Sequence, residues 1–105
     1  IAAIADDHEV VAVAGAPKKQ FVEKRLSEQA EEIMKSRETL VSNVPNENPV
    51  VDNAQFESQV MAPIYAGDEP EGLVVLMSKE PRQMGSTETK LVETAAAFLG
   101  KQLLQ

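Results

Sequence analysis

Short apolar runs separated by a polar turn open the chain. Residues 1–5 are almost entirely aliphatic, residues 6–9 are polar or charged, and residues 10–14 form a second aliphatic run that is rich in valine. Two short apolar runs on either side of a polar turn are typical of a β-hairpin. The sequence therefore predicts two antiparallel strands in this part of the chain.

Helical spacing replaces this pattern after the hairpin. Pro17 suits the first turn of a helix, where its missing N–H would have no partner, and apolar residues then recur at helical intervals. This pattern predicts a helix over residues 17–26. Ser27 is the predicted N-cap of a second helix, in which Ile33 and Met34 belong to the buried stripe.

The middle of the chain predicts three strands and one long loop. Residues 39–44 are rich in β-forming residues, and the prolines and asparagines that follow predict an irregular loop over residues 45–55. Residues 56–66 alternate between apolar and polar side chains, which indicates a strand with one buried face. Pro63 cannot donate to the ladder of this strand, so we expect it at an edge or a bulge. Residues 72–78 are apolar on both faces and predict a central strand.

The last helix is expected to begin with Ser86 as its N-cap. Its apolar stripe is wider than a surface helix with one buried side needs. The residues of the stripe are Leu91, Val92, Ala95, Ala96, Phe98, Leu99 and Leu103. We therefore expect part of the stripe to contact an upstream helix or another copy of the chain. The expected oligomerisation residues are Leu91, Ala95, Phe98, Leu99 and Leu103.

The order of the predicted elements favours an α+β fold. Two strands, two helices, three strands and a final helix give an antiparallel sheet flanked by helices, as in GAF, PAS and profilin domains. No strand–helix–strand repeat is visible, which disfavours a Rossmann fold. The 105 residues fit a single domain.

Charge and composition narrow the expected partners. The net charge of −7 opposes binding of this domain to nucleic acid, because the phosphate backbone requires clustered Lys and Arg. The nearest basic patch is Lys18, Lys19, Lys24 and Arg25. Glu23 and Glu28 interrupt it, which favours a solvated helix face over the alternative of phosphate binding. The absence of cysteine excludes disulfides and Cys-ligated zinc and agrees with a reducing compartment. No apolar run reaches the roughly 20 residues of a membrane span, so we expect no membrane partner and a cytoplasmic location.

Candidate catalytic and metal-binding residues are few. His8 is the only histidine, and it lies in the predicted hairpin turn beside Asp6, Asp7 and Glu9. A metal site would need ligands from elsewhere in the chain, so we expect a solvated turn and no metal. No nucleophile is paired with a base and no glycine-rich phosphate loop is present, so we expect neither an enzyme nor a cofactor. The methionines could line an adaptable pocket, but with so few aromatic residues we expect them to fill the core.

Several motifs resemble known regulatory domains. The segment MAPIY at residues 61–65, then Gly67 and the strand GLVVL at residues 72–76, is similar to the GAF family. The segment PKK at residues 17–19 and KLVETAAAFL at residues 90–99 resemble the C-terminal GAF domains of AbrB-family sporulation transcription regulators. The similarity covers essentially the whole chain in order.

The resemblance implies a regulator with two parts. In such proteins an N-terminal AbrB-type domain binds DNA, and a linker helix leads to a GAF domain that serves sensing and oligomerisation. Residues 1–105 are then expected to be a single GAF-like regulatory domain, a C-terminal fragment without the upstream helix and the DNA-binding part. The chain lacks the cysteines of catalytic and bilin-attaching GAF relatives and the NKxxFxxxDE signature of cyclic-nucleotide relatives.

The resemblance also suggests where a ligand would bind. GAF pockets lie between the sheet and the adjacent helices, closed by the loop between the middle strands, which here is residues 45–55. The candidate contacts for an unidentified small molecule are Arg37, Ser42, Phe56, Gln59 and Tyr65. The alternative is a purely structural dimerisation module that binds no ligand.

Overall fold

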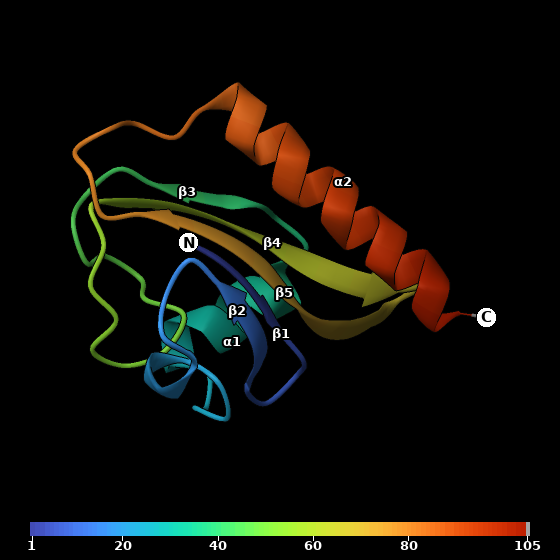
Figure 1. Ribbon diagram of the computed structural model, residues 1–105. Helices are drawn as coiled ribbons and strands as arrows, with labels where there is room; N and C mark the ends of the chain where they lie inside the picture. The colour runs from blue at the N-terminus through green and yellow to red at the C-terminus, as the bar shows by residue number, and fades with distance from the viewer. Residues whose placement is uncertain (105) are drawn as a thin grey trace.

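The computed structural model describes residues 1–104, which form one five-stranded sheet with a helix on each face (Figure 1). The elements in chain order are β1 (Ala2–Ala5), β2 (Val10–Ala14), the short 3-10 helix η1 (Lys18–Gln20), α1 (Glu28–Ser36), β3 (Leu40–Ser42), β4 (Ser58–Ala66), β5 (Glu69–Ser78) and α2 (Ser86–Leu103). The strand order is β2-β1-β5-β4-β3, and every neighbouring pair is antiparallel. The predicted α+β, GAF-like architecture is confirmed.

The β4–β5 hairpin forms the longest strand pairing of the sheet, and β5 is the central strand, as predicted. The two strands pair from Ser58 with Ser78 to Ala66 with Glu69. Gly72 lies where β5 passes the end of β1, and a Cβ at this position would collide with the carbonyl oxygen of Ala5. Only glycine therefore permits β1 to approach β5 this closely.

The face of the sheet that carries α1 holds the larger core, here called the α1-side core. Strands β1, β2, β4 and β5 contribute to it, together with α1 and two irregular segments, residues 15–27 and residues 43–57. Its buried members are Ala3, Ala5, Val10, Phe21, Leu26, Ala30, Met34, Val50, Val51, Phe56, Met61, Leu73, Val75 and Met77. Three of the four methionines pack here and Met84 is buried on the other face, which confirms their predicted role as core residues.

The opposite face carries the smaller α2-side core. It consists of Val60, Ala62, Ile64, Val74, Met84, Val92 and Ala96. Gly100 lets α2 lie directly on the backbone of β4, because a Cβ there would collide with the carbonyl oxygen of Tyr65. Helix α2 packs mainly against β4 and β5, so in the described residues 1–104 the β1–β2 half of this face is much less covered.

The predicted helix over residues 17–26 is wrong. Only the single turn of η1 forms, and the chain then runs alongside β2. The N–H of Val10 donates to the carbonyl of Lys24 at 3.1 Å, and the N–H of Glu23 donates to the carbonyl of Val10 at 2.9 Å. Glu23 has a φ of 68°, which no α-helix contains. Hydrogen bonds to the sheet edge thus replace the helical ladder, while Phe21 and Leu26 are buried in the α1-side core.

One of the two predicted caps is confirmed and the other is wrong. Ser27 caps α1, because its Oγ accepts a hydrogen bond from the N–H of Ala30 at 3.0 Å. Ser86 is not the N-cap of α2, since it is already the first helical residue. The N–H of Gly85 instead donates to Oε1 of Glu88 at 2.7 Å. This interaction, together with the backbone N–H of Glu88 and the nearby Arg82, lowers the pKa of Glu88 below its ordinary value.

Strand β4 differs from the predicted half-buried strand. It begins at Ser58 rather than at residue 56, and most of its side chains are buried on both faces because α1 and α2 cover it from opposite sides. Pro63 occupies a position that suits it. Strand β3 pairs only with Gln59 to Met61, so the β3 side of β4 is open at Pro63, and the register shifts just after Ile64.

Candidate functional site

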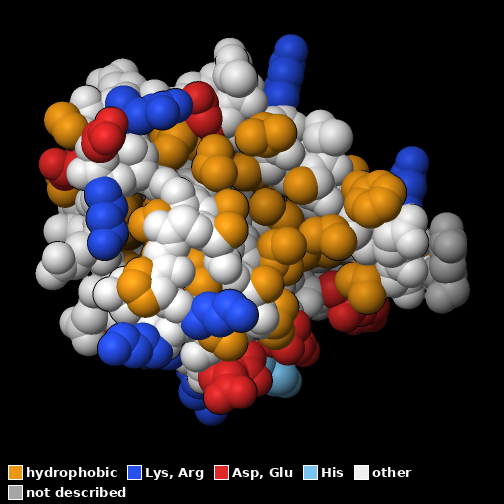
Figure 2. Space-filling model, viewed as in Figure 1, with side chains coloured by type: hydrophobic (Ala, Val, Ile, Leu, Met, Phe, Trp, Pro, Cys, Tyr) orange, Lys and Arg blue, Asp and Glu red, His pale blue; other side chains and the backbone are white. Residues whose placement is uncertain are grey.

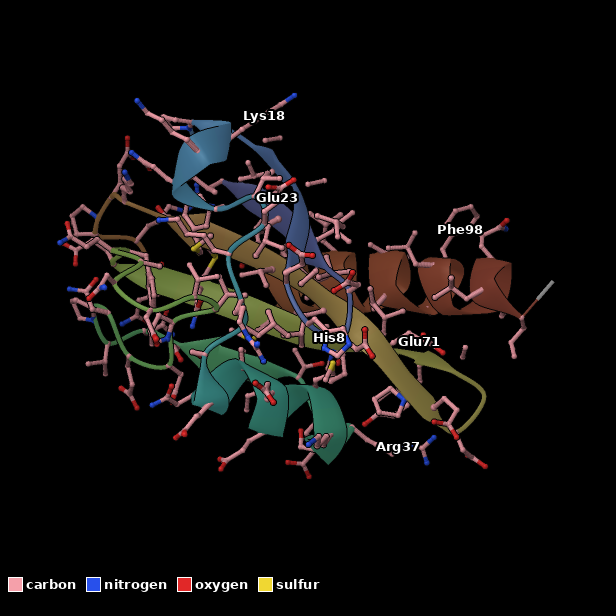
Figure 3. All side chains as sticks on the ribbon, turned by 90° about the horizontal axis from the view of Figure 1, so that it is seen from below. His8, Lys18, Glu23, Arg37, Glu71 and Phe98 are labelled. Atoms are coloured by element: carbon pink, nitrogen blue, oxygen red, sulfur yellow. The ribbon has the colours of Figure 1, made fainter. Side chains whose placement is uncertain are left out.

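The five predicted ligand contacts do not converge on one pocket. Arg37 and Tyr65 lie at the C-terminal end of α1. The Arg37 guanidinium lies 4.6 Å from the centre of the Tyr65 ring and donates to Asp68 Oδ1 and to the carbonyl of Gly67, both at 3.2 Å. The Tyr65 hydroxyl donates to the carbonyl of Met34 at 2.7 Å. These contacts tie the end of α1 to the β4–β5 turn, near which Figure 3 shows Arg37.

A shallow cavity of about 260 Å³ lies beside Arg37 and Tyr65. It lies along β4 and α2, beyond the first residue of β3, and its other polar side chains are Thr39 and Glu93. Oγ1 of Thr39 donates to Oε2 of Glu93 at 2.5 Å, so these two groups already satisfy each other. The polar groups that line this cavity already bond to other groups of the protein. A ligand there would therefore gain van der Waals contacts but few new hydrogen bonds.

Gln59 lies beneath the loop at residues 43–57, far along β4 from Tyr65. It is completely buried, and it pairs across the sheet with the buried Ser42 of β3. Its Nε2 donates to the backbone carbonyls of Glu47 at 3.2 Å and Asn48 at 2.5 Å, while its Oε1 has no partner among the described residues. Gln59 therefore anchors the loop from below and leaves one buried acceptor unsatisfied.

Phe56 holds the same loop at its other end. Its N–H donates to Oδ1 of Asn46 at 2.8 Å, and its carbonyl accepts from the N–H of Asn46 at 3.0 Å. The Phe56 ring is buried in the α1-side core with Val50 and Val51. These loop side chains occupy the space between the sheet and the loop in which the resemblance placed a ligand. A ligand at that place would have to displace them.

An open cleft that the sequence analysis missed lies next to this filled space. It has a volume of about 270 Å³ and runs between the segment that follows η1 and the loop at residues 52–55. Its lining consists of Gln20, Phe21, Lys24, Asp52, Asn53, Ala54, Gln55 and Lys79. Lys24 was assigned to a solvated helix face, and only the tertiary structure brings Lys79 to the same cleft.

The uncovered side of α2 carries several exposed apolar side chains. Leu91 and Phe98 are 60% and 62% exposed, and Ala95 and Leu99 are half-buried between them and the α2-side core. Phe98 points from α2 toward the side of the molecule on which β1 and β2 lie (Figure 3).

The sheet extends this feature beyond the helix. Ile4 of β1 and Leu76 of β5 are only half-buried next to α2. Ala2, Ala12 and Ala14 lie on the same sheet face as Ile4, because Ala12 pairs with Ile4, Ala14 pairs with Ala2, and residues two apart on a strand share a face. Apolar side chains accordingly form a continuous patch across the middle of this side of the molecule (Figure 2). We call this patch the α2 surface.

The remaining candidate chemistry stays on the exterior. The His8 side chain is 75% exposed in the β1–β2 turn, as expected, and lies 3.6 Å from the carboxylate of Asp7. Within residues 1–104 no three metal-binding side chains gather in one place. Neither of the two described helices combines the length and apolar character of a membrane span.

Comparisons with known proteins identify relatives over the whole described chain. The family model described as "Stage V sporulation protein T C-terminal, transcription factor" matches residues 1–104. Stage V sporulation protein T of Bacillus subtilis (strain 168) is 36% identical over 104 residues, which are 97% of this chain and 58% of that protein. The chain thus spans somewhat more than half the length of this curated relative.

A solved structure supports the fold independently. It is described as the far-red absorbing dark state of JSC1_58120g3 with bound biliverdin IXa, and it matches with a TM-score of 0.71. The match covers 99% of this chain and 78% of the other at 15% sequence identity. At this identity the similarity concerns the arrangement of helices and strands alone.

Proposed function

The chain belongs to the family of stage V sporulation protein T C-terminal, transcription factor domains, and from this premise we propose that it regulates a sporulation transcription factor through self-association. The observation that carries this proposal is the α2 surface. Leu91 and Phe98 are exposed at its centre, and Leu103, which is 57% exposed, follows Leu99 by one helical turn. A contiguous apolar patch that stays exposed in the single chain is typical of a protein interaction site.

A second copy of the chain is the occupant that fits this surface best. Each copy carries a net charge of −7, so two copies repel each other over most of their exteriors. On the exposed side of α2, between Leu91 and Phe98, the flanking side chains are uncharged, as at Thr94 and Ala95. A two-fold axis at this place would bury the same apolar residues from both copies without bringing acidic groups together.

The DNA contacts of such a regulator would belong to another part of the protein. The acidic balance of this chain opposes phosphate binding, and the curated relative is considerably longer than the matched segment. We assign DNA binding to an AbrB-type domain upstream, connected by a linker helix, in a cytoplasmic protein. In this arrangement residues 1–105 perform no catalysis and set the spacing of the DNA-binding domains.

Sedimentation analysis of single charge insertions tests the interface. Phe98→Asp and Leu91→Asp place a carboxylate at the centre of the α2 surface, so both should convert a dimer into monomers while the fold persists by circular dichroism. Leu103→Asp, at the edge, should weaken association less. Val44→Asp is the matched control, because Val44 is 56% exposed but lies outside the α2 surface. A parent chain that stays monomeric at high concentration would refute the interface.

Small-molecule sensing is a second candidate function, supported by the loop at residues 43–57. Gln59 holds this loop with one unsatisfied buried acceptor, and an open cleft borders it. A ligand that alters the loop would bind near Ser42, Phe56 and Gln59. It would not contact Arg37 or Tyr65, which lie toward the other end of β4. A thermal-shift screen with nucleotides, amino acids and short-chain metabolites tests this candidate. If none of them stabilises the chain, the purely structural module is favoured.

A further inference from the structure

Two lysines from distant parts of the sequence line the same cleft. Lys24 follows η1, and Lys79 follows the last residue of β5. Both line the cleft of about 270 Å³ described above, together with the carboxamides of Gln20, Asn53 and Gln55. The rim thus presents two ammonium groups and three side chains that can donate N–H bonds.

The ammonium groups of the two lysines have no ion-pair partner among residues 1–104. Among residues 1–104 the ion pairs are Asp7 with His8, Arg37 with Asp68, and Arg82 with Glu88, and neither lysine takes part in one. The cleft has one acidic side chain, Asp52, so its lining carries a net charge of +1 in a chain whose net charge is −7. This locally positive, partly enclosed site favours an anion over a cation, in contrast to the acidic balance of the whole chain.

The size and shape of the cleft limit the ligand. Its volume is slightly below the range of about 300–1,000 Å³ for drug-sized ligands, so the bound group must be small. Phe21, which is 3% exposed, and the half-buried Ala54 supply the apolar part of the lining.

A neighbouring cavity of about 240 Å³ shares Gln55 and Lys79 with the cleft and continues to Asn46, Phe56 and the acidic Glu57. The positive charge is thus greatest on the Lys24 side of Lys79. Asn46 and Phe56 exchange the backbone and side-chain bonds that hold the loop at residues 43–57. A ligand at Lys79 would therefore join the segment after η1 to that loop.

We propose that this cleft binds a small anion that bears a phosphate group or carboxylates, held by Lys24 and Lys79 and by the adjacent carboxamides. The proposal rests on the sensing function described above and names its ligand class. Hydrogen bonds from Ser27 to the carbonyls of Pro49 and Val50 already join the two irregular segments at one end. Binding in the cleft would add a second link between them, so the ligand would stiffen the α1 side of the domain and leave the α2 surface unchanged.

A titration followed by ¹H–¹⁵N NMR tests the site, with sodium phosphate and sodium succinate as probes against sodium chloride at equal ionic strength. At least one probe should produce saturable shifts at the backbone amides of residues 20–24, 52–55 and 79. Lys24→Gln and Lys79→Gln should each weaken binding about tenfold, the usual effect of losing one charge-assisted hydrogen bond. Lys79→Arg should retain most of the affinity, because it keeps the charge.

Lys90→Gln is the matched control, since Lys90 is exposed on α2 and lines neither cavity. Shifts that do not saturate, or an equal loss of affinity in Lys90→Gln and Lys79→Gln, would mean non-specific screening and overturn the site. Each variant is checked for an unchanged unfolding midpoint. If the anion site fails, the sedimentation test of self-association is not affected. If an uncharged compound stabilises the chain in the thermal-shift screen, the sensing function still stands but this anion site does not explain it.

Discussion

The two faces of the sheet are covered in different ways. On the α1 side a helix and two irregular segments close over all of the central strands, and buried side chains fill the space beneath them. On the α2 side one helix covers β4 and β5 (Figure 1). The apolar residues of β1 on this face and of the outer side of α2 are left partly exposed. One face is thus completed within the chain, and the other is completed only if something else packs against it.

The two faces therefore have different roles: one stabilises the fold, and the other is available for contact with a partner. The α1-side core stabilises the fold, because its residues reach full burial without a partner. The α2 surface contributes less to folding, since its largest side chains still contact water in the single chain. Substitutions on the two faces should therefore have different readouts, and the following experiments compare them.

The largest expected effect is the loss of a buried ring from the α1-side core. Phe21 is 3% exposed, so Phe21→Ala should lower the free energy of unfolding by about 3–5 kcal/mol in urea denaturation. Phe98→Ala removes the same ring from a position that is 62% exposed. Measured at a dilution where single chains dominate, its unfolding free energy should change by no more than about 0.5 kcal/mol. Equal losses in both variants would contradict the distinction between the faces.

A smaller effect is expected where α2 meets the sheet. Gly100→Ala would normally favour a helix, but here the added methyl group meets the carbonyl oxygen of Tyr65. The variant should therefore lose about 1–3 kcal/mol of unfolding free energy. Gly85→Ala is the control, because a Cβ at Gly85 meets nothing closer than Oε1 of Glu88 at 4.0 Å. A gain in stability from Gly100→Ala would show that α2 does not lie this close to β4.

The smallest effect concerns the start of α2 and depends on pH. The folded-state pKa of Glu88 is lowered by the N–H of Gly85, so the carboxylate stabilises the fold above the ordinary Glu pKa of about 4.3. This contribution is lost as the pH falls through the lowered pKa. Glu88→Gln should accordingly be less stable than the parent at neutral pH and should approach it in acid. A difference that grows as the pH falls would contradict the cap.

Local patterns in the sequence determined most of the sheet and both helices. The alternating and continuous apolar runs identified every strand, and β5 was placed at the centre because both of its faces are apolar. Ser27 marked the start of α1, since an N-cap depends only on residues within one turn. The width of the α2 stripe predicted that apolar residues of this helix extend beyond its contact with the sheet, and Leu91, Phe98 and Leu103 are indeed exposed. The partner predicted for them stays a prediction.

Only the tertiary structure decided the paths of the irregular segments and the grouping of distant polar residues. Residues 17–26 have helical spacing, yet they hydrogen-bond to the backbone of Val10 in β2. Val10 is too far away in the sequence for a pattern within residues 17–26 to predict this contact. The predicted ligand residues separate into two groups for the same reason, since β4 carries Gln59 and Tyr65 to opposite ends of the domain. Lys24 and Lys79 line the same cleft only because the fold brings two distant segments of the sequence together. A local sequence pattern contains no information about such long-range proximity.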